Sequence, residues 1–130
     1  HYRFYLEGIR QASTEIADLL ATGVSIVCDR YWLTTYVYHA VMGLEVDAAD
    51  FDGIVQPDLT VLLLVSPNVQ AERFLRRGLS TGDRRMINVQ SQLERQYLRT
   101  IERMNIRSCM INTDNLTPQE VVQRIVAELP

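Results

Sequence analysis

The chain contains no lysine, only two cysteines and no long apolar run. Every one of its 13 basic residues is therefore an arginine, and no motif that needs a lysine side chain lies within these 130 residues. No stretch approaches the roughly 18 uninterrupted apolar residues of a membrane span. Nor is there a basic, then apolar, then small-residue leader of the secretory kind. Cys28 and Cys109 lie in apolar runs without metal-binding spacing, so we expect buried, reduced thiols in a cytoplasmic protein.

The overall composition is that of an ordinary globular protein. The hydrophobic fraction is 47%, the charged fraction is 22% and the net charge is −3. A chain of 130 residues fits one domain, which we expect to extend over 1–130. The acidic balance does not favour a nucleic-acid partner, and nothing suggests a membrane partner. Arginine is the better bidentate phosphate ligand, although arginine-only usage can equally reflect genomic base composition.

Apolar spacing and capping residues predict helices alternating with short strands. Buried strands are predicted by continuous apolar runs over 24–28, 59–65 and 107–112. Helices are predicted over 4–21, 31–43, 67–78 and 87–104, with a last one opened by a Thr117–Glu120 capping box. The stretch 44–56 reads as an exposed loop, and the stretch around 78–87 as a polar loop. This alternation predicts an α/β fold with a parallel sheet and helices on both faces.

Polar segments follow each predicted strand, at the edge where open α/β sheets bind ligands. These segments are 29–31, 66–68 and 112–115. The first, Asp-Arg-Tyr, allows two interpretations. Asp29 and Arg30 could form a surface ion pair, or they could form a corner that binds phosphate and metal.

Four recognisable segments follow one another along the chain: DRYWLTTYVYH at 29–39, PDLTVLLLVSPNVQAERFLRRG at 57–78, GDRR followed by QLERQYLRTI, and MINTDNLTPQEVVQRIVAEL at 110–129. In this order they resemble motifs of the thymidylate kinase family, in which the third segment corresponds to the lid and the helix after it. The resemblance implies a three-layer α/β/α P-loop kinase fold. It also implies Mg²⁺-dependent transfer of a phosphoryl group from ATP to dTMP or a similar (deoxy)nucleoside monophosphate, as in dTDP biosynthesis. A homodimer is a further implication of the resemblance.

The resemblance also assigns expected roles to individual residues. Asp29 would lie at the magnesium and the reacting phosphates, and Arg30 would bind phosphate oxygens. Other expected catalytic residues are lid arginines, namely Arg84 and Arg85. Expected substrate contacts are Arg10, Thr34, Tyr38 and His39, and expected ATP contacts are Arg76, Arg77, Asn112, Thr113 and Asp114.

The chain departs from the family pattern at three places. Nothing matches the G-x-x-x-x-G-K-[ST] loop that binds ATP phosphates, so we expect the 130 residues to be inactive alone. His39 replaces a glutamine of the family pattern; it could contact the nucleotide or, equally, be a hydrogen-bonded core residue or a surface residue. Arg10 is the nearest arginine to the family's base-reading arginine, but it lies two positions away from the matching position. We interpret the chain as the carboxyl-terminal part of a longer kinase. The alternatives are a kinase for another nucleoside or small phosphate acceptor, or a non-catalytic nucleotide-binding or dimerisation module if His1 is the native start.

Overall fold

The computed structural model describes residues 1–129, with the side chains of Arg85 and Met86 excepted. These residues form two compact units, and each is described by itself. The first contains His1–Gln56 and Ser91–Thr100; the second contains Pro57–Gln90 and the chain from Ile101 onward. The expected single domain over 1–130 stays a prediction.

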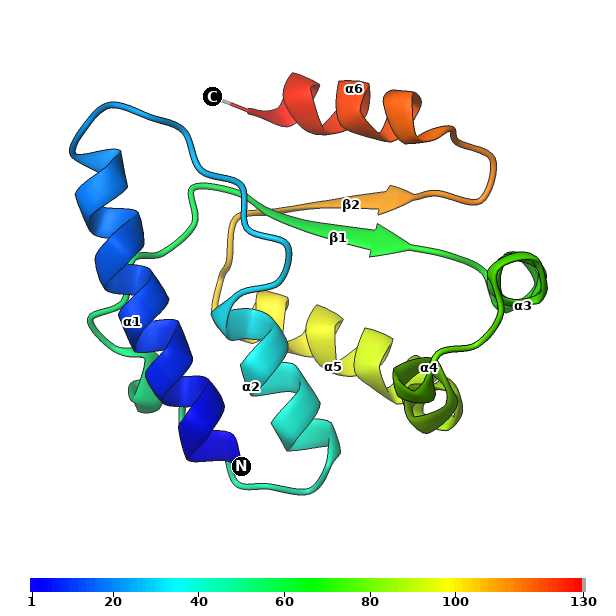
Figure 1. Cartoon of the computed structure of the whole chain (residues 1–130), viewed down its shortest axis with the longest axis horizontal. Helices are drawn as coiled ribbons and strands as arrows, with labels where there is room; N and C mark the ends of the chain where they lie inside the picture. The colour runs from blue at the N-terminus through cyan, green and yellow to red at the C-terminus, as the bar shows by residue number, and fades with distance from the viewer. Residues whose placement is uncertain (130) are drawn as a thin grey trace. The chain divides into compact units, whose positions relative to one another are not determined.

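The first unit is helical and holds most of the buried apolar side chains. Its elements are α1 (Tyr2–Leu20), α2 (Trp32–Val41), the short 3₁₀ helix η1 (Ala48–Phe51) and most of α5 (Gln90–Arg103). Helices α1 and α2 pack side by side (Figure 1). Phe51 is 4% exposed, and its ring centre lies 5.5 Å from that of Trp32 and 6.1 Å from that of Tyr36. Val37 is fully buried at the centre of α2.

Two expectations for the first unit are wrong. Residues 24–28 do not form a buried strand: the segment has no regular secondary structure, Val27 is 96% exposed, and Cys28 is exposed. A strand needs a neighbour for its backbone hydrogen bonds, and the sheet of the described residues contains only two other strands. The expected exposed loop over 44–56 includes η1 and buries both Phe51 and Ile54.

The second unit contains a two-stranded parallel sheet. Strands β1 (Thr60–Leu64) and β2 (Ser108–Asn112) pair from Thr60 opposite Ser108 to Leu64 opposite Asn112. The helices of this unit are α3 (Pro67–Arg77), α4 (Thr81–Met86), the 3₁₀ helix η2 (Ile87–Val89) and α6 (Pro118–Glu128). Helix α6 lies along β2 (Figure 1). The mixture of helices with a parallel sheet fits the predicted α/β class, whereas the three-layer arrangement stays a prediction.

Capping residues explain where two of these helices begin. Thr117 and Glu120 form the predicted capping box at α6, in which each side chain satisfies the other residue's backbone N–H. Ser80 and Asp83 form the same arrangement at α4. The segment expected to be an irregular polar lid loop is therefore partly helical. No helix within the described part of the chain is long and apolar enough to cross a bilayer.

Candidate functional site

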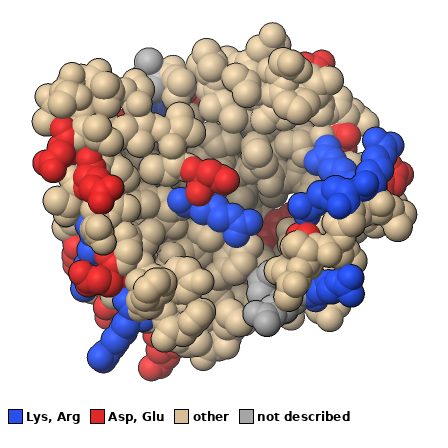
Figure 2. Space-filling view, viewed as in Figure 1, with Lys and Arg blue, Asp and Glu red and all other residues tan. Residues whose placement is uncertain are grey.

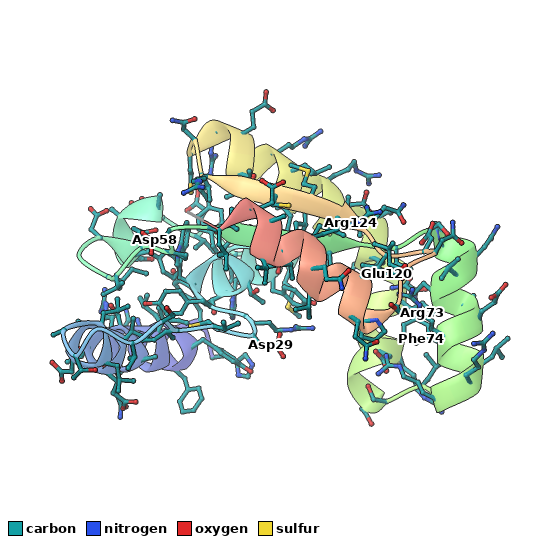
Figure 3. The ribbon with its side chains drawn as sticks, turned by 90° about the horizontal axis from the view of Figure 1, so that it is seen from above. Asp29, Asp58, Arg73, Phe74, Glu120 and Arg124 are labelled. Carbon is teal, nitrogen blue, oxygen red and sulfur yellow. The ribbon has the colours of Figure 1, made fainter. Side chains whose placement is uncertain are left out.

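Asp29 and Arg30 lie in the segment immediately before α2, and Figure 3 labels Asp29 there. Asp29 is exposed to solvent. Arg30 has a backbone φ of 69°, in the left-handed region. This conformation costs an L-residue other than glycine about 1–2 kcal/mol, and residues held in it are found preferentially at functional sites. The backbone at Arg30 is therefore strained where the motif predicts a phosphate-binding corner.

Tyr38 holds the guanidinium of Arg30. Nη1 of Arg30 donates a hydrogen bond to the Tyr38 hydroxyl at 3.3 Å, and the guanidinium carbon lies 5.6 Å from the centre of the Tyr38 ring. Tyr38 is the largest influence that raises the pKa of Arg30, with Asp29 contributing less. The main partner of Arg30 is thus an aromatic residue of α2 rather than the neighbouring acid. Two residues that were predicted separately as phosphate and nucleoside contacts are in direct contact.

Thr34 is also fixed from α5. The hydroxyl of Tyr97 donates a hydrogen bond to Thr34 Oγ1 at 3.0 Å. Burial raises the pKa of Tyr97 above its ordinary value. Sequence reasoning missed Tyr97, although its spacing from the buried Leu93 and Ile101 places all three on one helix face.

His39 is 8% exposed and lies among aromatic side chains of α1. Its ring centre is 5.0 Å from that of Tyr2 and 5.5 Å from that of Tyr5. Its Nδ1 lies 2.7 Å from the carbonyl oxygen of Thr35. A carbonyl oxygen only accepts, so Nδ1 is the donor in this hydrogen bond. This places His39 in the first unit's interior, one of the two environments considered for it.

Arg10 lies on α1 and contacts η1. Its Nη2 donates to the carbonyl oxygen of Asp50 at 3.2 Å, and the Tyr2 hydroxyl donates to Asp50 Oδ2 at 2.8 Å. Burial, together with the Asp50 carboxylate, raises the pKa of Tyr2. Arg10 thus helps to attach α1 to the segment around η1.

In the second unit, the predicted adenine-side residues Asn112, Thr113 and Asp114 form a turn at the ends of the strands. Thr113 donates twice to the carbonyl oxygen of Leu64, from its backbone nitrogen at 2.8 Å and from Oγ1 at 3.1 Å. The Ser66 backbone N–H donates to Asp114 Oδ1 at 2.7 Å, and this hydrogen bond lowers the pKa of Asp114. Oδ1 of Asn112 accepts from the backbone nitrogen of Asp114 at 2.8 Å. The turn is therefore joined both to β1 and to the start of α3.

Arg73, on α3, binds the same turn and was not predicted (Figure 3). Its Nη1 donates to Thr113 Oγ1 at 3.0 Å, and its Nη2 donates to the Thr113 carbonyl oxygen at 2.6 Å. The two residues are 40 positions apart, so no local pattern could have indicated the contact.

The arginines predicted as ATP contacts and as lid residues have different environments. Arg77 forms an ion pair with Asp83 at 2.9 Å, and its guanidinium lies 5.1 Å from the centre of the Phe74 ring. Hydrogen bonds from Ser80 are the main cause that lowers the pKa of Asp83. Arg76 and Arg84 are exposed, and basic side chains gather around α3 in Figure 2. The side chain of Arg85 lies outside the described residues.

Comparison with known proteins decides the family. The thymidylate kinase family model matches residues 1–125. The chain belongs to the thymidylate kinase family.

Individual relatives agree with this family. A thymidylate kinase of Rhodopseudomonas palustris is 31% identical over 126 residues, which cover 86% of this chain and 53% of the relative. A probable thymidylate kinase of Archaeoglobus fulgidus is 31% identical over 70 residues, covering 52% of this chain and 36% of the relative. One of Staphylothermus marinus is 33% identical over 70 residues, covering 52% and 34%. The chain thus spans about half the length, or less, of these curated relatives, and no solved structure matches it.

The residues expected from the thymidylate kinase resemblance divide between the two units. The first unit contains Arg10, Asp29, Arg30, Thr34, Tyr38 and His39; the second contains Arg76, Arg77, Arg84, Asn112, Thr113 and Asp114. Within the described residues, no group of three or more His, Cys, Asp or Glu side chains could hold a metal ion.

Proposed function

We propose that the complete protein containing this chain is a nucleoside monophosphate kinase. It transfers the terminal phosphoryl group of ATP to dTMP or a similar (deoxy)nucleoside monophosphate, giving the diphosphate. Membership of the family supports the reaction class. The observation that carries the assignment of the site is Arg30, whose backbone is held at a φ of 69° while Tyr38 fixes its guanidinium.

Arg30 and Asp29 suit complementary roles in phosphoryl transfer. The transition state spreads negative charge over the equatorial oxygens, so positioning and positive charge provide most of the catalysis. Arg30 supplies a permanent positive charge with a fork of N–H donors, which is the best side chain for phosphate oxygens. An exposed carboxylate such as Asp29 fits Mg²⁺, which takes one or two protein carboxylates and completes its shell with water and phosphate oxygens. Mg²⁺ bound there would supply further positive charge beside the reacting phosphates.

The loop that binds the ATP phosphates would come from a part of the complete protein outside these 130 residues. The absence of lysine supports this, because that loop requires one. We propose that residues 24–28 become a paired strand in the complete protein, next to the strand that leads into that loop. The backbone of these residues is not paired in a sheet and Val27 is 96% exposed, and both observations support a missing neighbour.

The environments of His39 and Arg10 favour a second candidate, a kinase of the same class with another acceptor. Both side chains already have partners within the first unit, the Thr35 carbonyl and the Asp50 carbonyl. If His39 nevertheless contacts the base, then His39→Gln shifts the kcat/KM ratio toward dTMP relative to other acceptors. An unchanged ratio assigns His39 to the packing of α2 alone.

The decisive experiment is an ADP-release assay on the complete protein. Wild-type protein is supplied with ATP, Mg²⁺ and, separately, dTMP, dUMP, UMP, CMP, AMP or GMP, with a reaction lacking acceptor as the blank. Arg30→Ala should lower kcat by about 100-fold or more, as expected when one preorganised donor to the reacting group is lost. Arg3→Ala, which removes an exposed arginine of α1, is the matched control and should retain full activity. Acceptor-independent ADP release, or normal turnover in Arg30→Ala, would overturn the proposal.

The homodimer and the cytoplasmic location implied by the family belong to the same proposal. Light scattering coupled to size exclusion tests the dimer: a monomeric mass for the active, complete protein contradicts it.

A further inference from the structure

We infer that Arg73 is a positioning residue for the adenine-side turn at 112–114. It acts by clamping Thr113 rather than by contacting the nucleotide. The inference rests on the proposed function, because it assumes that this turn contacts ATP. It adds a residue that the family resemblance did not indicate.

The geometry of the clamp uses both terminal nitrogens of one guanidinium. One donates to the Thr113 hydroxyl at 3.0 Å and the other to the Thr113 carbonyl at 2.6 Å. Two parallel donors on one planar group fix direction as well as distance. A lysine ammonium in the same place is a single point charge and lacks this fork.

Thr113 transmits the constraint to β1. It is 8% exposed, and its hydroxyl accepts from Arg73 while donating to the Leu64 carbonyl. The orientation of its one hydroxyl proton is thereby fixed. The Thr113 backbone nitrogen donates to the same carbonyl, so the residue is held from both sides. Its hydroxyl proton is therefore committed to Leu64, so the Thr113 side chain has no donor left for a ligand.

Loss of the clamp should therefore affect the affinity for ATP and spare the chemical step. The reacting phosphates are assigned to Asp29 and Arg30, which belong to the other unit. A turn that is free to move must be ordered again on binding, and this entropic cost appears in KM for ATP. The KM for the acceptor should therefore not change.

The test measures steady-state kinetics of the complete protein with four variants. Arg73→Met keeps an apolar stem and removes the fork; Arg73→Lys keeps the charge; Thr113→Val keeps the shape and removes the hydroxyl; the fourth combines Arg73→Met with Thr113→Val. Arg124→Met, at an exposed arginine of α6, is the matched control. Hydrogen exchange of the Thr113 and Ser66 amides, both donors within this network, provides a readout that does not depend on catalysis.

Arg73→Met should raise KM for ATP about fivefold to twentyfold, from the loss of charge-assisted hydrogen bonds at a partly exposed site. The kcat and the KM for the acceptor should stay within about twofold of wild type. Arg73→Lys should not restore KM, and the double variant should be no worse than Arg73→Met alone. Exchange at Thr113 and Ser66 should become faster in Arg73→Met and remain unchanged in Arg124→Met.

Three results would overturn the inference. Restoration by Arg73→Lys would show direct charge contact with the nucleotide, additive losses in the double variant would show independent roles, and an unchanged KM in Arg73→Met would show no role. If wild-type protein neither binds ATP nor transfers phosphate, the proposed function fails together with the ligand assigned to the turn. An active wild type with an unaffected Arg73→Met variant overturns only the role of Arg73.

Discussion

The strained backbone at Arg30 predicts that replacing this residue by alanine or by glycine changes stability and activity in different ways. Arg30→Ala removes the side chain but keeps an L-residue at a φ of 69°. Arg30→Gly removes the same side chain and also relieves the backbone. Both variants lose the same contacts with Tyr38, so the difference between alanine and glycine reports backbone effects alone, namely folded-state strain and unfolded-state entropy.

The magnitudes follow from the observed contacts. The exposed hydrogen bond to Tyr38 and the cation–π contact contribute about 0.5–1 kcal/mol each, so Arg30→Ala should lower the free energy of unfolding by about 1–2 kcal/mol. Relief of the left-handed conformation returns about 1–2 kcal/mol to the glycine variant, offset by about 0.5–1 kcal/mol of extra chain entropy in the unfolded state. Arg30→Gly should thus be more stable than Arg30→Ala by up to about 1.5 kcal/mol. Both variants should lose activity equally.

Urea titration of the complete protein at 25 °C measures the difference, with turnover measured on the same samples. Asn105 is the matched backbone control, because it has a φ of 51° after α5 and lies outside the proposed site. Asn105→Gly should likewise exceed Asn105→Ala in stability, without loss of activity. If alanine is as stable as glycine at Arg30 while glycine is favoured at Asn105, the reasoning about strain at Arg30 is refuted.

Three further outcomes are expected. In the 130-residue chain, a maleimide should label the exposed Cys28 much faster than the half-buried Cys109. In the complete protein, where residues 24–28 are proposed to form a strand, the labelling of Cys28 should become slow. Fast labelling of Cys28 in both proteins would contradict the proposed strand. Tyr31→Phe should leave the urea midpoint unchanged or raise it, because the Tyr31 hydroxyl is buried without a partner among the described residues. Tyr97→Phe should lower the free energy of unfolding by about 1 kcal/mol, because it removes the hydrogen bond to Thr34. A larger loss of stability in Tyr31→Phe than in Tyr97→Phe would refute this. Hydrogen bonds from Thr117 lower the pKa of Glu120 from its ordinary value of 4.5. The stability advantage of wild type over Glu120→Gln should therefore be complete well above pH 4.5 and should disappear as the pH falls through the lowered pKa. A difference in urea unfolding that does not change between pH 3 and 7 would contradict this.

The elements that the sequence predicted correctly depend on local signals. The capping box at Thr117 and the proline after Ser66 define helix starts within four residues. Ser80 and Asp83 carry the same signal, with aspartate in place of glutamate, and the helix they begin was missed because glycines nearby suggested a loop. Residues 24–28 have the composition of a strand, but a strand also needs a neighbour, which composition alone does not supply.

The candidate site was predictable only as a set of residues. The resemblance named Arg30 and Tyr38 separately, and their contact depends on a backbone conformation at Arg30 that arginine rarely adopts. Asp114 was expected beside the adenine, yet its carboxylate accepts the backbone N–H of Ser66, 48 positions earlier. Such contacts depend on how the strands align, which follows from tertiary packing rather than from spacing along the chain.

The parallel pairing of β1 with β2 also determines when the second unit can be completed during synthesis. Thr60 pairs with Ser108, so β1 leaves the ribosome well before its partner exists. At about 5–20 residues per second, the delay is roughly 2–10 seconds. Throughout that interval β1 lacks this partner, and the edge that will pair with β2 is available to other strands. Nascent chains stalled before residue 108 should therefore be the species most dependent on chaperones.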